Sequence, residues 1–260
     1  MKKTFNLFLI CGVLLFFISG CSDHKTNKNK LIVGMSADYP PFEFKEGEHF
    51  QGLDVDLAKL IGKQLNKEIE FKDLSFSSLF AALNSGQIDL AISTITATKE
   101  RSKIFDLSEP YYFADLALIF RKDQPVQSVS ELRTQKIGAQ LGSTMEAWVK
   151  DFFRDANFKD LKLITMDLNP QLIEALKSKQ IDIVVVEYVQ AKEFCKRNLD
   201  LGYLVAAKSG YGYAVAMKKN SALLKSVDVA LEHIKQQGDF TELENKWLEI
   251  AVEMDVHDAS

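Results

Sequence analysis

The chain has 260 residues, of which 47% are apolar and 26% charged, and its formal net charge is −4. A chain of this length and composition can build one or two hydrophobic cores. The acidic balance argues against a nucleic acid or an anionic surface as partner, because like charges repel.

The first 20 residues read as a secretory signal peptide that resembles the bacterial lipoprotein type. Met1-Lys2-Lys3 is a basic start, residues 5–18 are almost wholly apolar, and small residues then lead to Cys21. The apolar run is short for a membrane span, which takes about 20 residues. We expect Cys21 to carry a lipid and to become the mature amino terminus; ordinary cleavage beside an incidental cysteine is the alternative.

Residues 21–30 are polar and show no periodicity, so we expect a flexible tether there. Loss of the signal peptide removes two lysines and lowers the formal charge from −4 to −6. It also removes Cys11. With Cys21 lipidated, only Cys195 remains, which leaves the mature protein without an intramolecular disulfide.

Strands and helices alternate along the rest of the chain. The expected strands are residues 31–35, 68–71, 114–120, 136–139, 161–165 and 211–217. The expected helices are residues 54–65, 189–197, 222–236 and 240–252, with another helix opening at 142–143. This alternation predicts an α/β fold with mostly parallel sheets.

One unit of this pattern occurs twice. Residues 79–89 (LFAALNSGQID) and 172–182 (LIEALKSKQID) match without a gap at seven of eleven positions. Each segment reads as a helix and tight turn, followed by a short buried strand with a polar tip, Ser93-Thr94 in one and Glu187 in the other. Because ligands of open α/β sheets sit at the carboxyl ends of strands, two lobes of one design are expected to share a binding site. The alternative is that such units look alike only because packing makes them so.

An ordered set of motifs resembles the periplasmic amino-acid-binding proteins of ABC uptake systems, solute-binding protein family 3. The motifs are residues 36–44 (SADYPPFEF), 52–57 (GLDVDL), 88–91 (IDLA), 98–101 (TKER), 105–112 (FDLSEPYY) and 137–144 (IGAQLGST). Together they cover nearly the whole mature chain in the family's order and spacing. Within the family, the chain is most similar to arginine-binding lipoproteins.

The resemblance implies a two-lobe periplasmic-binding-protein fold with two hinge crossings. Lobe 1 would hold residues 31–112 and 211–256, and lobe 2 residues 113–210. The implied protein is a monomer, anchored by Cys21 in the periplasm or at the cell surface of a bacterium. It would capture a free amino acid, with arginine favoured, and deliver it to the membrane permease of an ABC transporter.

The resemblance also implies contacts for the α-carboxylate of the ligand. Arg101 matches the family's clamp, and a guanidinium pairs bidentately with a carboxylate. Ser143 and Thr144 match a loop that faces the same carboxylate from the other lobe, although either could simply cap a helix. Ser93, Thr94 and Thr96 match the polar strand tip that meets the amine and carboxylate, unless they only fill a turn.

The remaining implied contacts concern the ligand amine and side chain. Glu187 matches the partner of the α-ammonium, where the family usually has Asp. Tyr39 and Phe76 match an aromatic pair that stacks on the side chain, as suits a planar guanidinium; Phe76 could equally be ordinary core. Asp38 and Glu43 are the candidate carboxylates for a cationic side chain, although their motif also occurs in binders of neutral ligands.

Other chemistries have little support in the sequence. The four histidines share no metal-ligand spacing, no phosphate-binding loop is present, and no cofactor is expected. Two alternatives to a transport receptor stay open. A dehydratase-like enzyme on the same fold could use Glu187 as a general acid. A surface adhesin could also be built on this fold.

Overall fold

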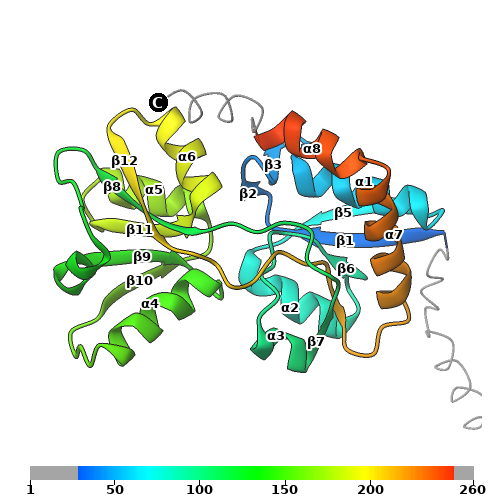
Figure 1. Cartoon of the computed structure of the whole chain (residues 1–260), viewed down its shortest axis with the longest axis horizontal. Coiled ribbons are helices and arrows are strands. Elements are labelled where there is room, and N and C mark those ends of the chain that lie inside the picture. The colour runs from blue at the N-terminus through cyan, green and yellow to red at the C-terminus, as the bar shows by residue number, and fades with distance from the viewer. Residues whose placement is uncertain (1–28, 249–260) are drawn as a thin grey trace, which may run out of the picture.

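The computed structural model describes residues 29–248, which form two α/β lobes joined by two crossings of the chain (Figure 1). The two-lobe fold expected from the sequence is confirmed. The signal peptide, Cys21, most of the tether and the residues beyond Leu248 lie outside the described residues.

The first lobe holds a five-stranded sheet in the order β5-β1-β6-β13-β7. Its strands are β1 (Lys30–Met35), β5 (Glu68–Asp73), β6 (Leu90–Ala91), β7 (Phe105–Leu107) and β13 (Ala216–Lys218). One face of this sheet is covered by α1 (Leu53–Gln64), α7 (Leu224–Gln236) and α8 (Asp239–Leu248). The other face is covered by α2 (Phe76–Ser85). The short helix α3 (Lys99–Ile104) contacts β7. A small hairpin sheet of β2 (Asp38–Tyr39), β3 (Glu43–Glu46) and β4 (His49–Gln51) precedes α1.

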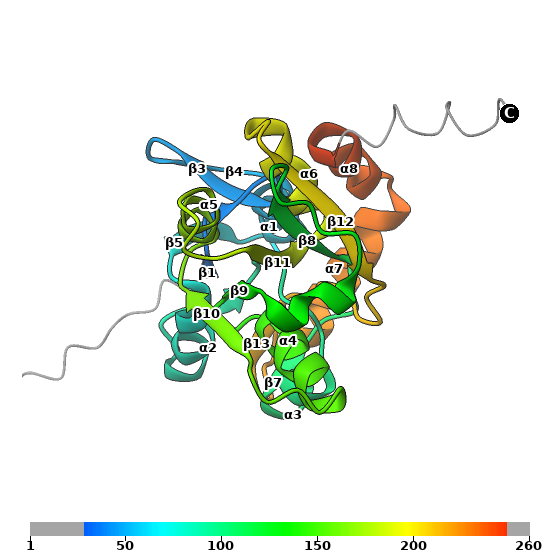
Figure 2. The same cartoon turned by 90° about the vertical axis from the view of Figure 1, so that its left-hand side faces the viewer.

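The second lobe repeats this plan with the strand order β10-β9-β11-β8-β12. Its strands are β8 (Leu116–Arg121), β9 (Lys136–Gln140), β10 (Lys162–Met166), β11 (Ile183–Glu187) and β12 (Leu201–Ala207). Helix α4 (Thr144–Asp155) covers one face, whereas α5 (Asn169–Lys177) and α6 (Tyr188–Arg197) cover the other, as Figure 2 shows with this lobe toward the viewer. A 3-10 turn, Val129–Thr134, precedes β9.

Both sheets are mixed, which differs from the expectation of mostly parallel sheets. In each lobe three strands pair in parallel, β5-β1-β6 and β10-β9-β11. The other two strands in each sheet pair antiparallel to their neighbours. The physical reason is the double crossing: the strands that carry the chain between lobes run toward the junction in one crossing and away from it in the other.

The repeated segment has the same geometry in both lobes. A Cβ on Gly34 would lie 2.5 Å from Ile88 Cδ1, and a Cβ on Gly138 would lie 2.5 Å from Ile181 Cδ1. The two segments also share the hydrogen bonds of the aspartates that end them. Asp89 accepts from the backbone N–H of Ile32 at 2.8 Å, and Asp182 accepts from that of Lys136 at 2.9 Å. The repeat therefore marks one packing unit used twice, as the sequence predicts.

The two crossings, residues 108–115 and 208–215, run side by side between the lobes. The N–H of Tyr111 donates to the carbonyl of Tyr213 at 2.8 Å, and the N–H of Tyr213 donates to that of Tyr112 at 2.7 Å. The strand expected at 211–217 is therefore a regular strand only from Ala216, because its first part belongs to the crossing. Among residues 29–248, no helix is both long enough and apolar enough to cross a membrane.

Candidate ligand-binding site

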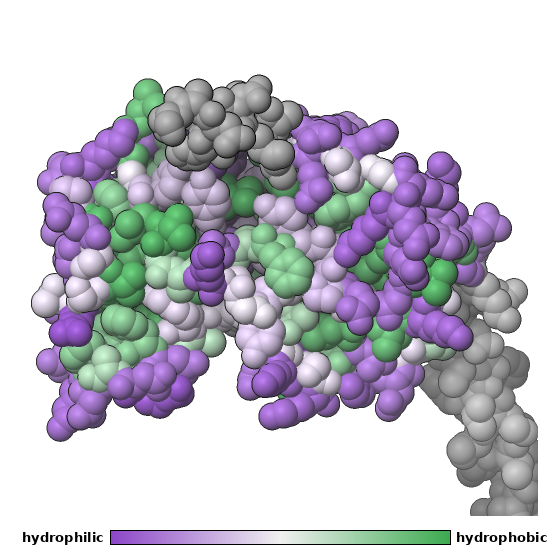
Figure 3. Space-filling view, viewed as in Figure 1, coloured by the Kyte–Doolittle hydropathy of each residue, from purple (hydrophilic) through white to green (hydrophobic). Residues whose placement is uncertain are grey.

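The lobes are closed on one another, and polar residues make the contacts between them. Five contacts among the described residues join the strand tips and helix starts of the two lobes: Tyr39 with Glu187, Asp38 with Asn169, Ser77 with Asp167, Thr96 with Thr144, and Arg101 with Gly142. The surface is notched where the lobes meet (Figure 3). Seven of the eleven predicted contact residues are thus at, or directly beside, one junction: Asp38, Tyr39, Thr96, Arg101, Ser143, Thr144 and Glu187.

Glu187 stands at the carboxyl end of β11 and faces the first lobe. The hydroxyl of Tyr39 donates a hydrogen bond to Glu187 Oε2, and the N–H of Glu187 donates to that hydroxyl oxygen at 3.3 Å. Burial raises the pKa of Glu187 to about 8, although the nearby Tyr213 hydroxyl favours the charged form. A buried carboxyl that has no cation beside it is a natural partner for an ammonium group.

Arg101 lies in α3 and reaches across the junction. Its guanidinium donates to the carbonyl of Thr96 at 2.9 Å and to that of Gly142, in the other lobe, at 3.2 Å. The ring centroids of Phe76 and Phe80 lie 5.5 and 5.0 Å from its Cζ. Burial lowers its pKa to about 10, so it stays charged at neutral pH, and no carboxylate within residues 29–248 forms an ion pair with it. Arg101 can therefore bind the carboxylate of a ligand by donating hydrogen bonds to it.

The loop before α4 brings the hydroxyl of Thr144 to the junction. Ser143 caps the helix, accepting from the N–H of Glu146 at 3.2 Å while its own hydroxyl donates to Gln140 O at 2.7 Å. The Thr144 hydroxyl is 3.3 Å from that of Thr96. The capping alternative considered for Ser143 is thus realised, and Thr144 is the hydroxyl that faces the other lobe.

Ser93, Glu43 and Asp54 form a buried polar cluster inside the first lobe. Ser93 donates to Glu43 Oε1 at 2.7 Å, and the N–H of Thr94 donates to Asp54 Oδ2 at 2.8 Å. Burial, and then the charge of Asp54, raise the pKa of Glu43 well above its ordinary value, and burial raises that of Asp54 to about 6. The hydroxyl of Tyr111, on the first crossing, donates to both oxygens of Asp54 at 2.9 Å.

This cluster gives the strand tip its unusual backbone. Thr94 has φ +46°, a left-handed conformation that non-glycine residues adopt rarely. Its N–H is held there by the carboxylate of Asp54. Asp54 was not among the predicted site residues, because an acid in the first turn of a helix reads as an ordinary exposed residue. Its complete burial, on the apolar side of α1, is what the sequence pattern did not reveal.

Asp38 connects the lobes through a helix start. Its Oδ2 accepts from the backbone N–H of Asn169, the first residue of α5, at 2.7 Å, and its Oδ1 accepts from the Ser36 hydroxyl at 2.9 Å. Helix α5 has no side-chain cap from its own N-cap residue, Leu168. The carboxylate of Asp38 thus caps α5 from the opposite lobe, and burial raises its pKa to about 6.

Tyr39 and Phe76 belong to the cores on opposite faces of the first sheet. Tyr39 packs with the cluster that contains Phe42, and Phe76 packs with the cluster that contains Phe80. Both are buried, at 3% and 6% exposure.

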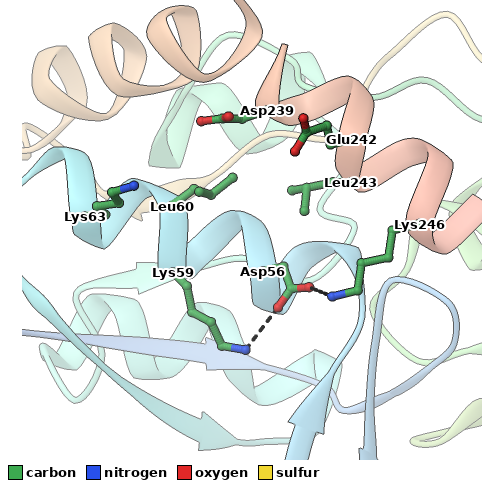
Figure 4. A pocket seen from close by; sticks show the side chains of 8 residues that line it. All are labelled: Asp56, Lys59, Leu60, Lys63, Asp239, Glu242, Leu243 and Lys246. Carbon is green, nitrogen blue, oxygen red and sulfur yellow. Dashed lines mark hydrogen bonds and ion pairs between the residues drawn. The ribbon is translucent and has the colours of Figure 1, made fainter. Parts of the chain in front are cut away.

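A separate hollow between α1 and α8, of about 490 Å³, lies away from the junction (Figure 4). Asp56 accepts there from Lys59 at 3.0 Å and from Lys246 at 2.7 Å. Burial alone raises the pKa of Asp56, but the bonds from Lys246, Lys59 and Trp247 outweigh it and lower the pKa. Asp56 is thus already paired with two of the lysines that line the hollow. Within the described residues, no group of three or more His, Cys, Asp or Glu side chains could hold a metal ion.

The geometry defines a two-lobe solute receptor, in which a cation from one lobe and a carboxyl from the other face a shared junction. Comparison with known families agrees. Residues 31–250 match the bacterial extracellular solute-binding proteins, family 3, and the chain belongs to this family. The prediction of a solute-binding protein is confirmed, and the enzyme alternative finds no support, since the family and the relatives described next are binding proteins.

Similar proteins include several arginine binders. The arginine-binding extracellular protein ArtP of Bacillus subtilis is 37% identical over 256 residues, which cover 95% of this chain and 98% of ArtP. The structure of an ancestral arginine-binding protein bound to arginine has a TM-score of 0.79 and 37% identity, covering 84% of this chain and 98% of that one. An ancestral arginine-binding protein bound to glutamine has the same TM-score, with 36% identity and coverages of 84% and 97%.

Proposed function

We propose that this protein captures free arginine between its lobes and delivers it to the membrane permease of an ABC transporter. The observation that carries the proposal is the pair of opposite groups at the junction. Within residues 29–248, the half-buried cation Arg101 has no carboxylate partner, and the buried carboxyl of Glu187 has no cation beside it. An α-amino acid carries the two complementary charges at one end. The similar arginine-binding proteins support arginine as the ligand.

In this proposal the α-carboxylate binds Arg101, with Thr144 and the N–H groups at the start of α4 on its other side. Thr96 shares this end of the ligand through its contact with Thr144. The α-ammonium binds Glu187, whose carboxyl becomes charged when a cation lies beside it. Ser143 shapes the α4 loop as its cap, and Ser93 and Thr94 hold the strand tip in place.

The ligand side chain would stack between Tyr39 and Phe76. Of the two candidate carboxylates for its guanidinium, Glu43 is favoured over Asp38. Glu43 Oε2 has no hydrogen-bond partner among the described residues, whereas both oxygens of Asp38 are occupied. A guanidinium beside Glu43 would restore its charge. The proposed role of Asp38 is to hold the lobes together.

The remaining parts of the proposal follow from the sequence. The proposed lobes are residues 31–112 with 211–256, and 113–210, so that both boundaries fall within the crossings. Cys21 is proposed to anchor a monomeric protein by its lipid, in the periplasm or at the cell surface, with residues 21–30 as tether. Mass spectrometry of the membrane fraction would test the lipid on Cys21.

A thermal-shift screen of the twenty amino acids, followed by competition titrations against labelled arginine, tests the ligand. Arginine is expected to bind more tightly than lysine, and lysine more tightly than glutamine, because the aromatic slot suits a planar cation. Glutamine is the demanding competitor, since a similar ancestral protein is seen bound to it. Displacement of arginine by a neutral amino acid at equal concentration would refute the preference for a cationic ligand.

A further inference from the structure

The side chain of Asn169 is one of two buried amides, with Gln190 of α6, that have no hydrogen-bond partner among the described residues. It is 1% exposed, and neither Nδ2 nor Oδ1 has a hydrogen-bond partner among the described residues. Burying an amide without partners is costly, and most buried polar side-chain atoms in folded proteins are hydrogen-bonded. Gln140, which is also a buried amide of the second lobe, does have a partner, because its Nε2 donates to Asp167 O at 3.0 Å. The unpaired amide of Asn169 therefore needs an explanation.

Asn169 is held at the junction by its own backbone. It is the first residue of α5, and its N–H donates to Asp38 Oδ2 of the first lobe at 2.7 Å. Helix α5 contacts β2, the two-residue strand that consists of Asp38 and Tyr39. The amide is thus fixed beside the strand that carries one of the two proposed stacking rings, and it comes from the opposite lobe.

The direction of Tyr39 relates Asn169 to the ligand. The hydroxyl end of Tyr39 contacts Glu187, whereas its backbone adjoins Asp38, which contacts Asn169. A ligand whose ammonium pairs with Glu187 and whose side chain stacks along the Tyr39 ring runs from the hydroxyl end toward the backbone end. Its distal group then arrives on the side of Asp38 and Asn169.

We infer that Asn169 binds the distal group of the ligand side chain, with Oδ1 accepting a hydrogen bond from the guanidinium of arginine. This inference rests on the proposed function, and it makes Asn169 a specificity-determining residue from the second lobe. The chemistry is matched, because a guanidinium presents five donors and no acceptor, and one carboxylate cannot satisfy all of them. Only a side chain long enough to reach past the Tyr39 ring would use Asn169.

The test compares arginine with ornithine, whose shorter side chain lacks the guanidinium, by calorimetry on wild type and Asn169→Ala. The substitution keeps the backbone N–H that Asp38 accepts. Arginine should bind roughly 10- to 100-fold more weakly to the variant, as expected for one hydrogen bond to a charged group. Ornithine should weaken less than about threefold, because its amine does not reach the amide.

A structural role predicts different results. Removing an unpaired buried amide should leave the ligand-free melting temperature unchanged or raise it, whereas an amide with an internal partner should lower it on removal. Asp38→Asn is the matched control, since it weakens closure and should affect arginine and ornithine by the same factor. Equal loss for both ligands in Asn169→Ala, or unchanged arginine affinity, would overturn the inference while the proposed function stands. Failure of wild type to bind arginine would overturn both.

Discussion

Raising the pH should open the ligand-free protein, because closure buries the carboxyl of Glu187. In the closed structure this group lies against the Tyr39 hydroxyl, and burial raises its pKa to about 8 from an ordinary value of 4.5. In an open cleft the carboxyl is hydrated and returns toward the ordinary value. The closed form therefore holds a proton that the open form gives up.

The size of the effect follows from proton linkage. Below the ordinary pKa of 4.5 both forms are protonated, and the closed form keeps its full stability. Between that value and about 8 only the open form is ionised, and each pH unit disfavours closure by about 1.4 kcal/mol. Because this slope falls off as the pH approaches 8, the closed form should lose roughly 1.6 kcal/mol between about pH 6.5 and about pH 8, a factor of about 15 in population. Asp38 also titrates at the junction, but its pKa of about 6 places most of its effect below this range.

Spin-label distances between the lobes would measure this change. Labels at Asn84→Cys and Lys159→Cys, two exposed positions in different lobes, would be used with Cys195→Ser, which removes the free thiol. The short-distance population of the ligand-free protein should fall as the pH rises. Glu187→Gln, which keeps the shape and removes the titration, should abolish that dependence. A distance distribution that is constant over this range in wild type, or that changes equally in Glu187→Gln, would refute the reasoning.

Two further predictions concern ligand binding and folding. Arg101→Ala should cost roughly 2–5 kcal/mol of arginine binding by calorimetry, because the ligand carboxylate is left buried and unpaired; unchanged affinity would remove Arg101 from the site. Gly52→Ala should destabilise the protein by roughly 3 kcal/mol or more in urea unfolding, because its Cβ would lie 2.1 Å from Phe42 O at φ +121°. Gly47→Ala is the matched control at φ +60° with no atom within 4 Å, and equal losses in the two variants would contradict the clash.

The architecture was predictable from the sequence where local patterns decide the structure. The repeated segment predicts two lobes, and the equivalent packing of Ile88 on Gly34 and of Ile181 on Gly138 is a physical reason for the same isoleucine in both copies. Strand β12 (Leu201–Ala207) was missed, because its exposure alternates but its residues, LGYLVAA, do not alternate between apolar and polar. The antiparallel pairings were missed for another reason: strand direction depends on which lobe a crossing enters, and no local pattern encodes that.

The sequence predicts which types of residue lie at the junction, but it does not predict which residue each of them contacts. Asp38 and Glu43 have similar chemistry and sit five residues apart, yet one caps α5 in the other lobe and the other adjoins Asp54 inside its own. Asn169 precedes a proline at the start of a helix, a pattern typical of an ordinary helix N-terminus. Its importance lies in a contact between residues 131 positions apart, which only the closed fold creates.

Closure itself should depend on both charges of the amino acid, and agmatine, which is arginine without its carboxylate, tests this. Moving a two-state equilibrium from 1:99 to 99:1 takes about 5.5 kcal/mol of differential binding. One desolvated charge pair supplies roughly 2–5 kcal/mol, so the ammonium with Glu187 and the carboxylate with Arg101 are both needed. Agmatine leaves Arg101 bound only to the carbonyls of Thr96 and Gly142. At saturation it should therefore leave a sizeable long-distance population in the same spin-label measurement, where arginine leaves almost none. Equal closure by the two ligands would show that the carboxylate clamp does not drive the change.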